Sequence, residues 1–288
     1  MIAQASMFRK GWSQSAALAG DEIPRDPAMP QLGMLLDGSA MAALMRDAGI
    51  PASSPALERC RIVNVRYRPG RQFIVSYALE GDDAGARQRQ IRFVTAKIVG
   101  DASGERHLAK RLKAAEQAGT AVRYVPEHRL TLTEFPDDLR VHGIRRATEA
   151  GSLEEVIRRV LAAPEAVLAD SGDGTPAMSV VSYRPERFCL VRFGVRRTLA
   201  AACPENVYAR VHRDHKGAGV HETMTALWNC AARRSGLLSV AEPLGYDPAT
   251  QMLFQGAAPG QPLGEMVPSE AILDHIAAAG RSLAAVHD

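Results

Sequence analysis

The chain has 288 residues, of which 46% are hydrophobic and 23% are charged, so it can bury the core of one large domain or of two ordinary ones. Its 35 basic and 32 acidic residues leave a formal net charge of +3, which excludes a strongly basic nucleic-acid binder and an acidic disordered tail. No stretch approaches the roughly 18 apolar residues of a membrane span, and the N-terminus lacks the apolar core of a signal peptide. We therefore expect a cytoplasmic protein that binds neither a membrane nor nucleic acid.

Cysteine and histidine patterns predict no metal centre and no nucleophile. The four cysteines form no CxxC pair, and in a chain without a signal peptide they are expected to be reduced. Cys189 lies between Phe188 and Leu190 on a predicted strand, which favours core packing over nucleophilic work. The histidines between residues 212 and 221 are spread across a strand-to-helix loop and do not share one helical face, so we expect surface histidines.

The first 55 residues are predicted to be an irregular segment that contains one short helix. Residues 1–34 are weakly periodic and rich in glycine, proline and serine. The helix is expected over 39–48, where Met41, Leu44 and Met45 recur at helical spacing.

Residues 56–170 are predicted to fold as one lobe-like α+β unit, a cap. Three antiparallel strands are expected first, then a helix, a short strand with a turn, and a second helix. The expected ranges are 62–67, 73–79 and 91–99 for the strands, 130–140 for the short strand and turn, and 152–163 for the second helix, and the first helix is expected to be capped by Ser103. The second helix is placed by a capping box at Ser152 and Glu155 and is ended by Pro164. The Gly-rich and Asp-rich loop at 170–176 is the predicted domain boundary.

The pattern of the first unit returns after this loop. Residues 65–77 read VRYRPGRQFIVSY, and residues 181–193 read VSYRPERFCLVRF. The third strands also correspond, as FVTAKIVGD from residue 93 and VYARVHRDH from residue 207. Such self-similarity predicts a second unit over 176–288 with the same architecture. Its expected elements are strands at 179–183, 188–193 and 207–211, a helix at 220–233, strands at 241–246 and 252–255, a connector at 256–263 and a last helix from 269.

Four ordered segments of the second unit carry a resemblance to a known family. They read SYRPERFCLVRF, VYARVHRD, AEPLGYDPATQMLFQGAAPGQPL and AGRSLAAVH. Together they resemble the phosphotransferase enzyme family, the aminoglycoside-phosphotransferase and choline-kinase-like branch of the protein-kinase-like fold. The resemblance covers about residues 176–288 and, more loosely, 56–150. It implies an α+β fold with a duplicated kinase-like N-lobe, in which 176–288 supplies the second lobe, the hinge and the start of the C-terminal lobe.

The resemblance assigns nucleotide binding to six residues. Arg210 takes the place of the strand-three lysine that holds the phosphates, and Glu222 takes the place of its helical partner. Arginine keeps the charge, but its planar fork is longer than the lysine chain. The other four residues are those of the hinge, whose main chain receives adenine: Phe254, Gln255, Gly256 and Ala257. A buried strand end is the alternative for these four residues.

The first unit carries Lys97 and Glu105 at the matching positions. A solvated strand residue and an ordinary first-turn acid are the simpler interpretation of this pair. The turn at 184–187 lacks the glycines of a phosphate cradle, so a plain hairpin turn remains open.

The catalytic parts of the family are not found in this sequence. His212, Arg213 and Asp214 mimic a catalytic loop, but they leave a strand just before a helix, which argues against a catalytic role. No HGDxxxxN or DxD run occurs, and no set of carboxylates is recognisable as magnesium ligands. We therefore expect an N-terminal fragment, inactive alone, of an ATP- and Mg²⁺-dependent phosphotransferase that acts on the hydroxyl of a small-molecule acceptor. The catalytic residues and Mg²⁺ ligands are expected in a C-terminal lobe that is missing from this chain.

Two other classes of function compete with this interpretation. A non-catalytic regulatory or binding module derived from the kinase-like fold would follow if arginine in place of lysine marks lost chemistry. Nucleic-acid binding through the arginine-rich faces is disfavoured, because the net charge is only +3 and aromatic residues make up only 5% of the chain.

Overall fold

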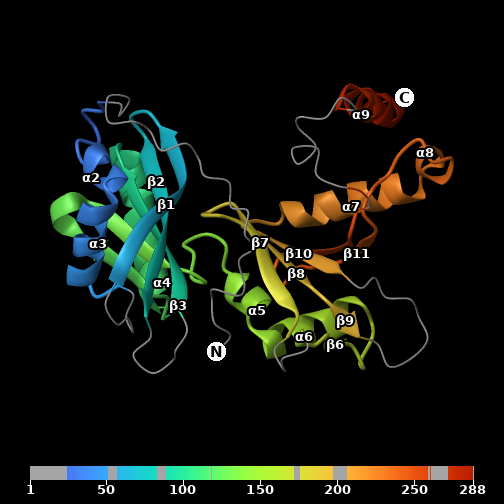
Figure 1. The fold of residues 1–288 in the computed structure, drawn as a ribbon, viewed down its shortest axis with the longest axis horizontal. Coiled ribbons are helices and arrows are strands. Elements are labelled where there is room, and N and C mark those ends of the chain that lie inside the picture. The colour runs from blue at the N-terminus through green and yellow to red at the C-terminus, as the bar shows by residue number, and fades with distance from the viewer. Residues whose placement is uncertain are drawn as a thin grey trace. The chain divides into compact units, whose positions relative to one another are not determined.

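The computed structural model of the chain describes residues 25–50, 57–82, 89–117, 119–171, 176–196, 206–258, 260 and 272–287. These residues form a mixed α+β fold with antiparallel sheets, which confirms the predicted class (Figure 1). By their contacts they divide into two units. The first unit holds the described residues up to Arg145 together with Ser179–Cys189, and the second holds Arg146–Met178 and those from Leu190 onward. Residues 146–178 thus group with the second unit, whereas the sequence predicts the boundary at 170–176.

The first unit is built on a five-stranded sheet in the order β1-β2-β3-β5-β4. Its strands are β1 (Leu57–Arg68), β2 (Gln72–Asp82), β3 (Arg89–Val99), β4 (Val122–Val125) and β5 (Leu130–Glu134). The predicted strands are present and longer than expected, because their ladders continue into the polar chain beyond the apolar alternation. The sequence gives no sign of β4, which is short and has no buried residue. The middle of the predicted loop at 80–90 lies outside the described residues.

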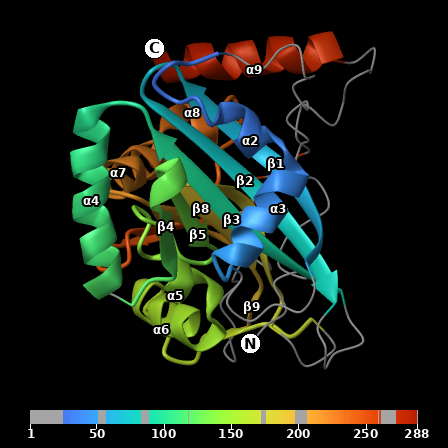
Figure 2. The same cartoon turned by 90° about the vertical axis from the view of Figure 1, so that its left-hand side faces the viewer.

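Two helices cover one face of this sheet, the face toward the viewer in Figure 2. They are α2 (Leu32–Leu36) and α3 (Gly38–Asp47). The sequence predicts only one helix here, but Asp37 divides the segment, because its carboxylate accepts hydrogen bonds from two N–H groups of the first turn of α3. Met41 and Met45 on α3 are fully buried and pack against the apolar side chains of the sheet. The predicted irregular residues 1–24 lie outside the described residues.

The opposite face of the first sheet carries α4 (Ala102–Gln117), which follows β3 directly. Leu108 of α4 packs there with Val99 and Leu139. The helix begins under the control of Asp101, whose carboxylate accepts a hydrogen bond of 2.5 Å from the N–H of Gly104. The prediction that Ser103 caps α4 is therefore wrong, since the capping residue is an aspartate two positions earlier and Ser103 lies inside the helix.

The second five-stranded sheet has the strand order β11-β12-β10-β8-β7, and its residues 179–189, which span most of β7 and the start of β8, group by their contacts with the first unit. Its strands are β7 (Met178–Arg184), β8 (Phe188–Phe193), β10 (Val207–His212), β11 (Pro243–Asp247) and β12 (Met252–Gly256). A two-stranded sheet joins β6 (Val167–Leu168) to β9 (Val195–Arg196). The remaining helices are α5 (Ile144–Thr148), α6 (Ala150–Val160), α7 (Lys216–Asn229), α8 (Ala231–Arg234) and α9 (Ile272–His287). A 3-10 turn, η2 (Pro126–His128), lies between β4 and β5 of the first unit.

Helices α6 and α7 lie on opposite faces of the second sheet (Figure 1). Two consecutive residues of β11 show why, since neighbours on a strand point to opposite faces. A Cβ on Gly245 would come within 2.5 Å of Val160 in α6. The ring of the next residue, Tyr246, touches Gly217, and a Cβ on that glycine would lie only 2.6 Å from the ring. Gly217 and Gly245 therefore allow the two helices to approach the sheet closely.

The helix boundaries of the second unit differ from the predicted ones. Helix α6 begins at Ala150, with Glu149 at the N-cap, so the predicted capping box does not start it, and it ends at Val160 instead of 163. Helix α7 begins four residues before the predicted 220 and ends before Cys230, which caps the separate α8. The predicted start of the last helix at 269 and residues 261–263 of the connector lie outside the described residues.

The two sheets follow the same path from strand to strand. Counted from the first strand of each, the order is first, second, third, fifth, fourth, and a long helix, α4 or α7, joins the third strand to the fourth. The turns between the first two strands also agree in hydrogen bonding. The N–H of Arg71 donates to the carbonyl of Arg68 at 3.0 Å, and the N–H of Arg187 donates to the carbonyl of Arg184 at 3.0 Å.

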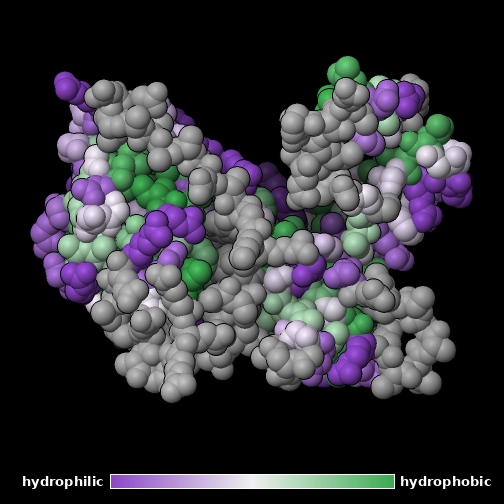
Figure 3. Space-filling view, in the orientation of Figure 1, coloured by the Kyte–Doolittle hydropathy of each residue, from purple (hydrophilic) through white to green (hydrophobic). Residues whose placement is uncertain are grey.

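Helix α9 carries apolar residues on its surface, visible as green atoms at its position in Figure 3. Leu273, Ile276 and Leu283 are 72%, 50% and 60% exposed. Within the described ranges, none of the helices combines the length and the apolar character needed to cross a membrane.

Candidate functional site

Arg210 and Glu222, the predicted phosphate-side pair, lie on two different elements, β10 and α7. Arg210 is half-buried on β10, opposite Leu253 of β12. Glu222 is exposed on α7. A helix turns by about 100° per residue, so Glu222 points about 140° away from Gly217, the buried residue through which α7 meets the sheet.

Residues 254–257, the predicted adenine hinge, form the end of β12 and the chain just beyond it. The side chain of Phe254 is fully buried and meets the ring of Phe193 edge-on at 6.2 Å, so only its main chain can face a ligand. Gln255 is half-buried, Gly256 is buried and Ala257 is exposed. The polypeptide thus passes from the core to the surface within these four residues.

A cavity of about 670 Å³ lies beside the end of this segment. The residues that line it include Asn206, Trp228, Arg233, Glu242, Gly256 and Ala257. The guanidinium of Arg233 lies 3.4 Å from the centre of the Trp228 ring, a cation–π contact. Asn206 immediately precedes β10, and side-chain alternation along the extended chain puts it on the same face as Arg210. The cavity therefore opens on the side of β10 that carries Arg210.

The segment that resembles a catalytic loop lies where the sequence predicts, between β10 and α7. Asp214 pairs with Arg213 at 3.2 Å and accepts a hydrogen bond from the N–H of Lys216 at the start of α7. These contacts give Asp214 a structural place at the helix start. Across the described ranges, no three or more His, Cys, Asp and Glu side chains are grouped so that they could hold a metal ion.

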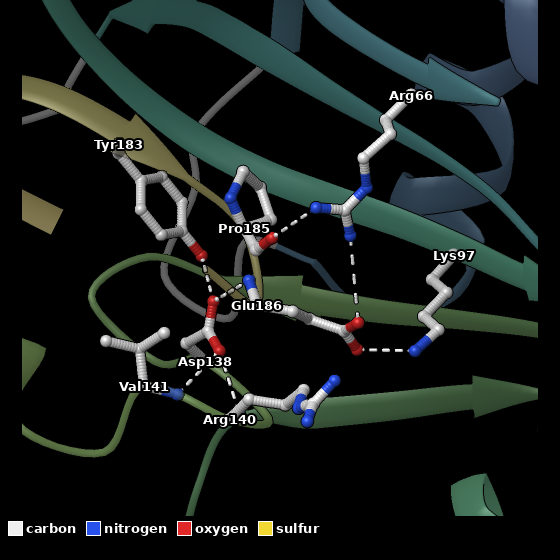
Figure 4. Close-up of polar contacts among 8 residues, drawn as sticks. All are labelled: Arg66, Lys97, Asp138, Arg140, Val141, Tyr183, Pro185 and Glu186. Carbon is white, nitrogen blue, oxygen red and sulfur yellow. Dashed lines mark hydrogen bonds and ion pairs between the residues drawn. The ribbon is translucent and has the colours of Figure 1, made fainter. Parts of the chain in front are cut away.

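A different set of polar side chains is buried in the first unit, and we call it the Glu186 cluster (Figure 4). It consists of Arg66 on β1, Lys97 on β3, Asp138 after β5, Tyr183 on β7 and Glu186 in the turn between β7 and β8. Only 10% of the Lys97 side chain and 8% of the Glu186 side chain are exposed, so their charges meet largely out of water.

Glu186 provides the carboxylate for both cations of the cluster. The ammonium of Lys97 lies 2.5 Å from one carboxylate oxygen, and the guanidinium of Arg66 lies 3.8 Å from the other. Arg66 also donates a hydrogen bond of 3.2 Å to the carbonyl of Pro185. Lys97 therefore does not pair with Glu105, as the family pattern would imply; Glu105 forms an ion pair with Arg129 instead.

Asp138 holds the backbone of the same turn. One of its carboxylate oxygens accepts hydrogen bonds from the Tyr183 hydroxyl at 2.7 Å and from the Glu186 N–H at 2.8 Å. The other oxygen accepts from the N–H groups of Arg140 and Val141 at 2.7 and 2.9 Å. Four donors thus converge on one buried carboxylate, which needs no cation of its own to satisfy its lone pairs.

Glu186 has an uncommon backbone conformation. Its φ is 60°, in the left-handed region, where a residue other than glycine is strained by about 1–3 kcal/mol. The equivalent turn of the first sheet has Gly70 at this place, with φ of 65°. A glutamate at a position suited to glycine indicates that its side chain is required there, and the contacts with Lys97 and Arg66 supply the reason.

The anchoring by an aspartate recurs in the turn of the first sheet. Asp26 accepts hydrogen bonds from the hydroxyl of Tyr67 at 2.9 Å and from the N–H of Gly70 at 2.8 Å, on one carboxylate oxygen. Its other oxygen accepts from the N–H of Ala28 at 3.0 Å. Asp26 therefore binds Tyr67 and Gly70 in the same way as Asp138 binds Tyr183 and Glu186: one carboxylate oxygen accepts from the tyrosine hydroxyl and from a backbone N–H of the turn.

The hydrogen bonds of Asp26 predict how the stability of the fold changes in acid. The N–H of Gly70 is the main cause that lowers its pKa from 3.8, with Tyr67 and Ala28 acting in the same direction and burial against them. A carboxyl group with a lowered pKa in the folded state stabilises the fold above its ordinary pKa, and that contribution is lost as the pH falls below it. In denaturant titrations we expect wild type to exceed Asp26→Asn in free energy of unfolding by a constant amount from about pH 6 to 4, and by less below about pH 4. A difference that does not shrink in acid would contradict the assignment.

Burial shifts the pKa values of three other groups. The pKa of the Lys97 ammonium is lowered, mainly by burial, although Glu186 acts against the shift. The pKa of Tyr183 is raised well above its ordinary value, first by burial and then by the charge of Asp138. Burial also raises the pKa of the Cys189 thiol, and the predicted core packing of this cysteine is confirmed because its side chain is fully buried.

Sequence reasoning singled out Lys97 but missed its true partners. Asp26 and Asp138 were not recognised, because each lies outside the hairpin whose turn it binds. One signal was present in the aligned turns, where RPGR of the first copy becomes RPER in the second and the glutamate replaces the glycine.

Comparison of the chain with protein-family models, with curated proteins and with solved structures found no match in any of the three.

Proposed function

We propose that this chain is the nucleotide-binding part of an ATP-dependent phosphotransferase that acts on the hydroxyl of a small-molecule acceptor. In this proposal both units are kinase-like N-lobes that arose by duplication. The second unit binds the nucleotide, and the first is a cap that does not. Residues 254–257 and Arg210 are the parts of the second unit that contact ATP.

One observation carries the proposal, namely the equal register of the two sheets. Lys97 stands opposite Thr131, the second residue of β5, and Arg210 stands opposite Leu253, the second residue of β12. The strand order is also the same in both sheets, with a long helix after the third strand. Arg210 therefore occupies in its sheet the position that Lys97, the family-type lysine, occupies in the first.

The second unit has room for a nucleotide on the face that Arg210 shares. The cavity of about 670 Å³ borders Gly256 and Ala257 and falls within the usual size of ligand sites. Arg210 is four positions along the chain from Asn206, which lines the cavity, and an extended chain covers about 13 Å over four positions. This distance suits an adenine at the hinge and phosphates at the guanidinium. Arg210 would neutralise phosphate charge, and main-chain groups at 254–257 would orient the base.

The described residues do not fit Mg²⁺, the second cofactor that the resemblance implies. Magnesium is held by carboxylates together with substrate phosphates, and the described residues include no group of three or more His, Cys, Asp and Glu side chains placed to hold a metal ion. We therefore derive no catalytic step through a metal from these residues. The role of these residues is to bind and orient the nucleotide.

The alternative, a regulatory or binding module without catalysis, is favoured by the state of Lys97. In the first unit this lysine pairs with Glu186 inside the fold, so its charge is already satisfied without a nucleotide. This observation applies to the first unit alone. It leaves the corresponding face of the second unit to be tested for binding.

Titration with a fluorescent ATP analogue tests the proposal directly. We expect the wild-type chain to bind the analogue and Arg210→Ala to bind at least about tenfold more weakly, since a charge-assisted contact with phosphate is lost. Arg196→Ala is the matched control, because it removes an exposed arginine of the same unit and should leave affinity unchanged. Circular dichroism should show that all three proteins are folded. Equal affinity of wild type and Arg210→Ala would remove the role of Arg210, and no binding by wild type would favour the regulatory module.

A further inference from the structure

We propose that Glu186 acts as an internal anionic ligand, whose carboxylate closes a cationic pocket of the first unit to soluble anions such as pyrophosphate. The pocket is the part of the Glu186 cluster around Lys97 and Arg66. The turn at 184–187 would then be an autoinhibitory contact built into the fold. This inference does not depend on nucleotide binding by the second unit.

The charges around Glu186 are those of an anion site. Lys97 and Arg66 reach its two carboxylate oxygens from β3 and β1, the strands on either side of β2, as Figure 4 shows. Arg111 and Arg140 are near enough to Lys97 to make its protonation less favourable. Asp138, the other carboxylate of the cluster, is occupied by four hydrogen-bond donors that fix the turn. Glu186 is therefore the carboxylate that pairs with Lys97 and Arg66 in the pocket.

An unused donor lies beside the lysine. Thr131 stands directly opposite Lys97 in the β3–β5 ladder, so both side chains lie on the same face of the sheet. Thr131 is only 1% exposed, and its hydroxyl has no hydrogen-bond partner in the described part of the chain. A buried hydroxyl next to an ammonium is a suitable contact for an oxyanion, and the Glu186 carboxylate does not use it.

The pocket is full while Glu186 is in place. The space between Lys97, Thr95, Thr133 and Glu186 is about 10 Å³, at the lower limit for a single water molecule. A soluble anion can therefore enter only if the glutamate leaves. The positive φ of Glu186 supports this interpretation, because glycine suits that conformation better and stands there in the first turn.

The test measures pyrophosphate binding by titration calorimetry on the full chain. Wild type is expected to show no binding. Glu186→Gln and Glu186→Gly should each bind pyrophosphate at least about tenfold more tightly than the weakest affinity that the calorimetry can detect. Glu186→Gln keeps the shape of the side chain without its charge, and Glu186→Gly suits the backbone. Adding Lys97→Met to Glu186→Gln should abolish the binding. The control Glu127→Gln removes an exposed carboxylate of the same unit and should behave as wild type.

Each other result overturns the proposal. If wild type binds pyrophosphate and Lys97→Met removes that binding, the pocket is not closed. If the folded Glu186 variants do not bind, or bind equally well with Lys97→Met, the pocket is not an anion site. If both Glu186 variants fail to fold, the carboxylate is an indispensable structural part and not an exchangeable ligand. Titration with chloride at equal ionic strength separates specific binding from screening.

Discussion

Replacing Lys97 with methionine is expected to lower the free energy of unfolding by about 3–5 kcal/mol. The substitution leaves the Glu186 carboxylate buried without its nearest cation, since Arg66 lies at 3.8 Å against 2.5 Å for Lys97. A buried charge that loses its partner keeps its desolvation penalty but loses the attraction that offset it. Denaturant titration at pH 7, followed by circular dichroism, measures the change.

The double variant distinguishes an ion pair from simple packing. Combining Lys97→Met with Glu186→Gln removes both charges, so most of the stability lost in Lys97→Met should return. Lys110→Met serves as a control, because Lys110 is exposed on α4 and should contribute within about 0.5 kcal/mol. Additive losses in the double variant would show that the two side chains do not interact energetically.

The sheets were the most predictable part of the fold. Short runs rich in apolar residues at 73–79 and 188–193 identify two strands, in which Val75 and Val191 are fully buried. The turns RPGR and RPER mark the hairpins between the strands. These signals are local, because period and turn chemistry are both written in a few consecutive residues.

Helix starts and the Glu186 cluster were less predictable, for a common reason. The carboxylates of Asp37 and Asp101 start α3 and α4 from outside the apolar pattern that identifies a helix. In the cluster, Lys97 and Glu186 are far apart in the sequence and meet only when a turn reaches a distant strand. Nothing in the sequence next to Lys97 specifies such a partner, so the family pattern suggested Glu105 in its place.

Replacing Asp138 with alanine should be nearly as destabilising as the change at Lys97, although it removes no ion pair. The hydroxyl of Tyr183 and the N–H groups of Val141 and Glu186 are all buried and would lose their acceptor. A buried donor left unsatisfied is unfavourable by about 1–3 kcal/mol, so the three together predict a loss of at least about 3 kcal/mol. The turn would also lose the contact that holds Glu186 at positive φ.

Tyr183→Phe separates the two contributions. It removes one donor and leaves Asp138 with three others, so we expect a loss of only about 1 kcal/mol. Proton exchange at the Glu186 amide, followed by NMR, provides a second measurement. Exchange should accelerate strongly in Asp138→Ala and little in Tyr183→Phe, because only the first substitution frees that N–H from its acceptor. If the two variants lose equal stability and exchange alike, the anchor is the tyrosine and its packing against Phe135, and not the carboxylate.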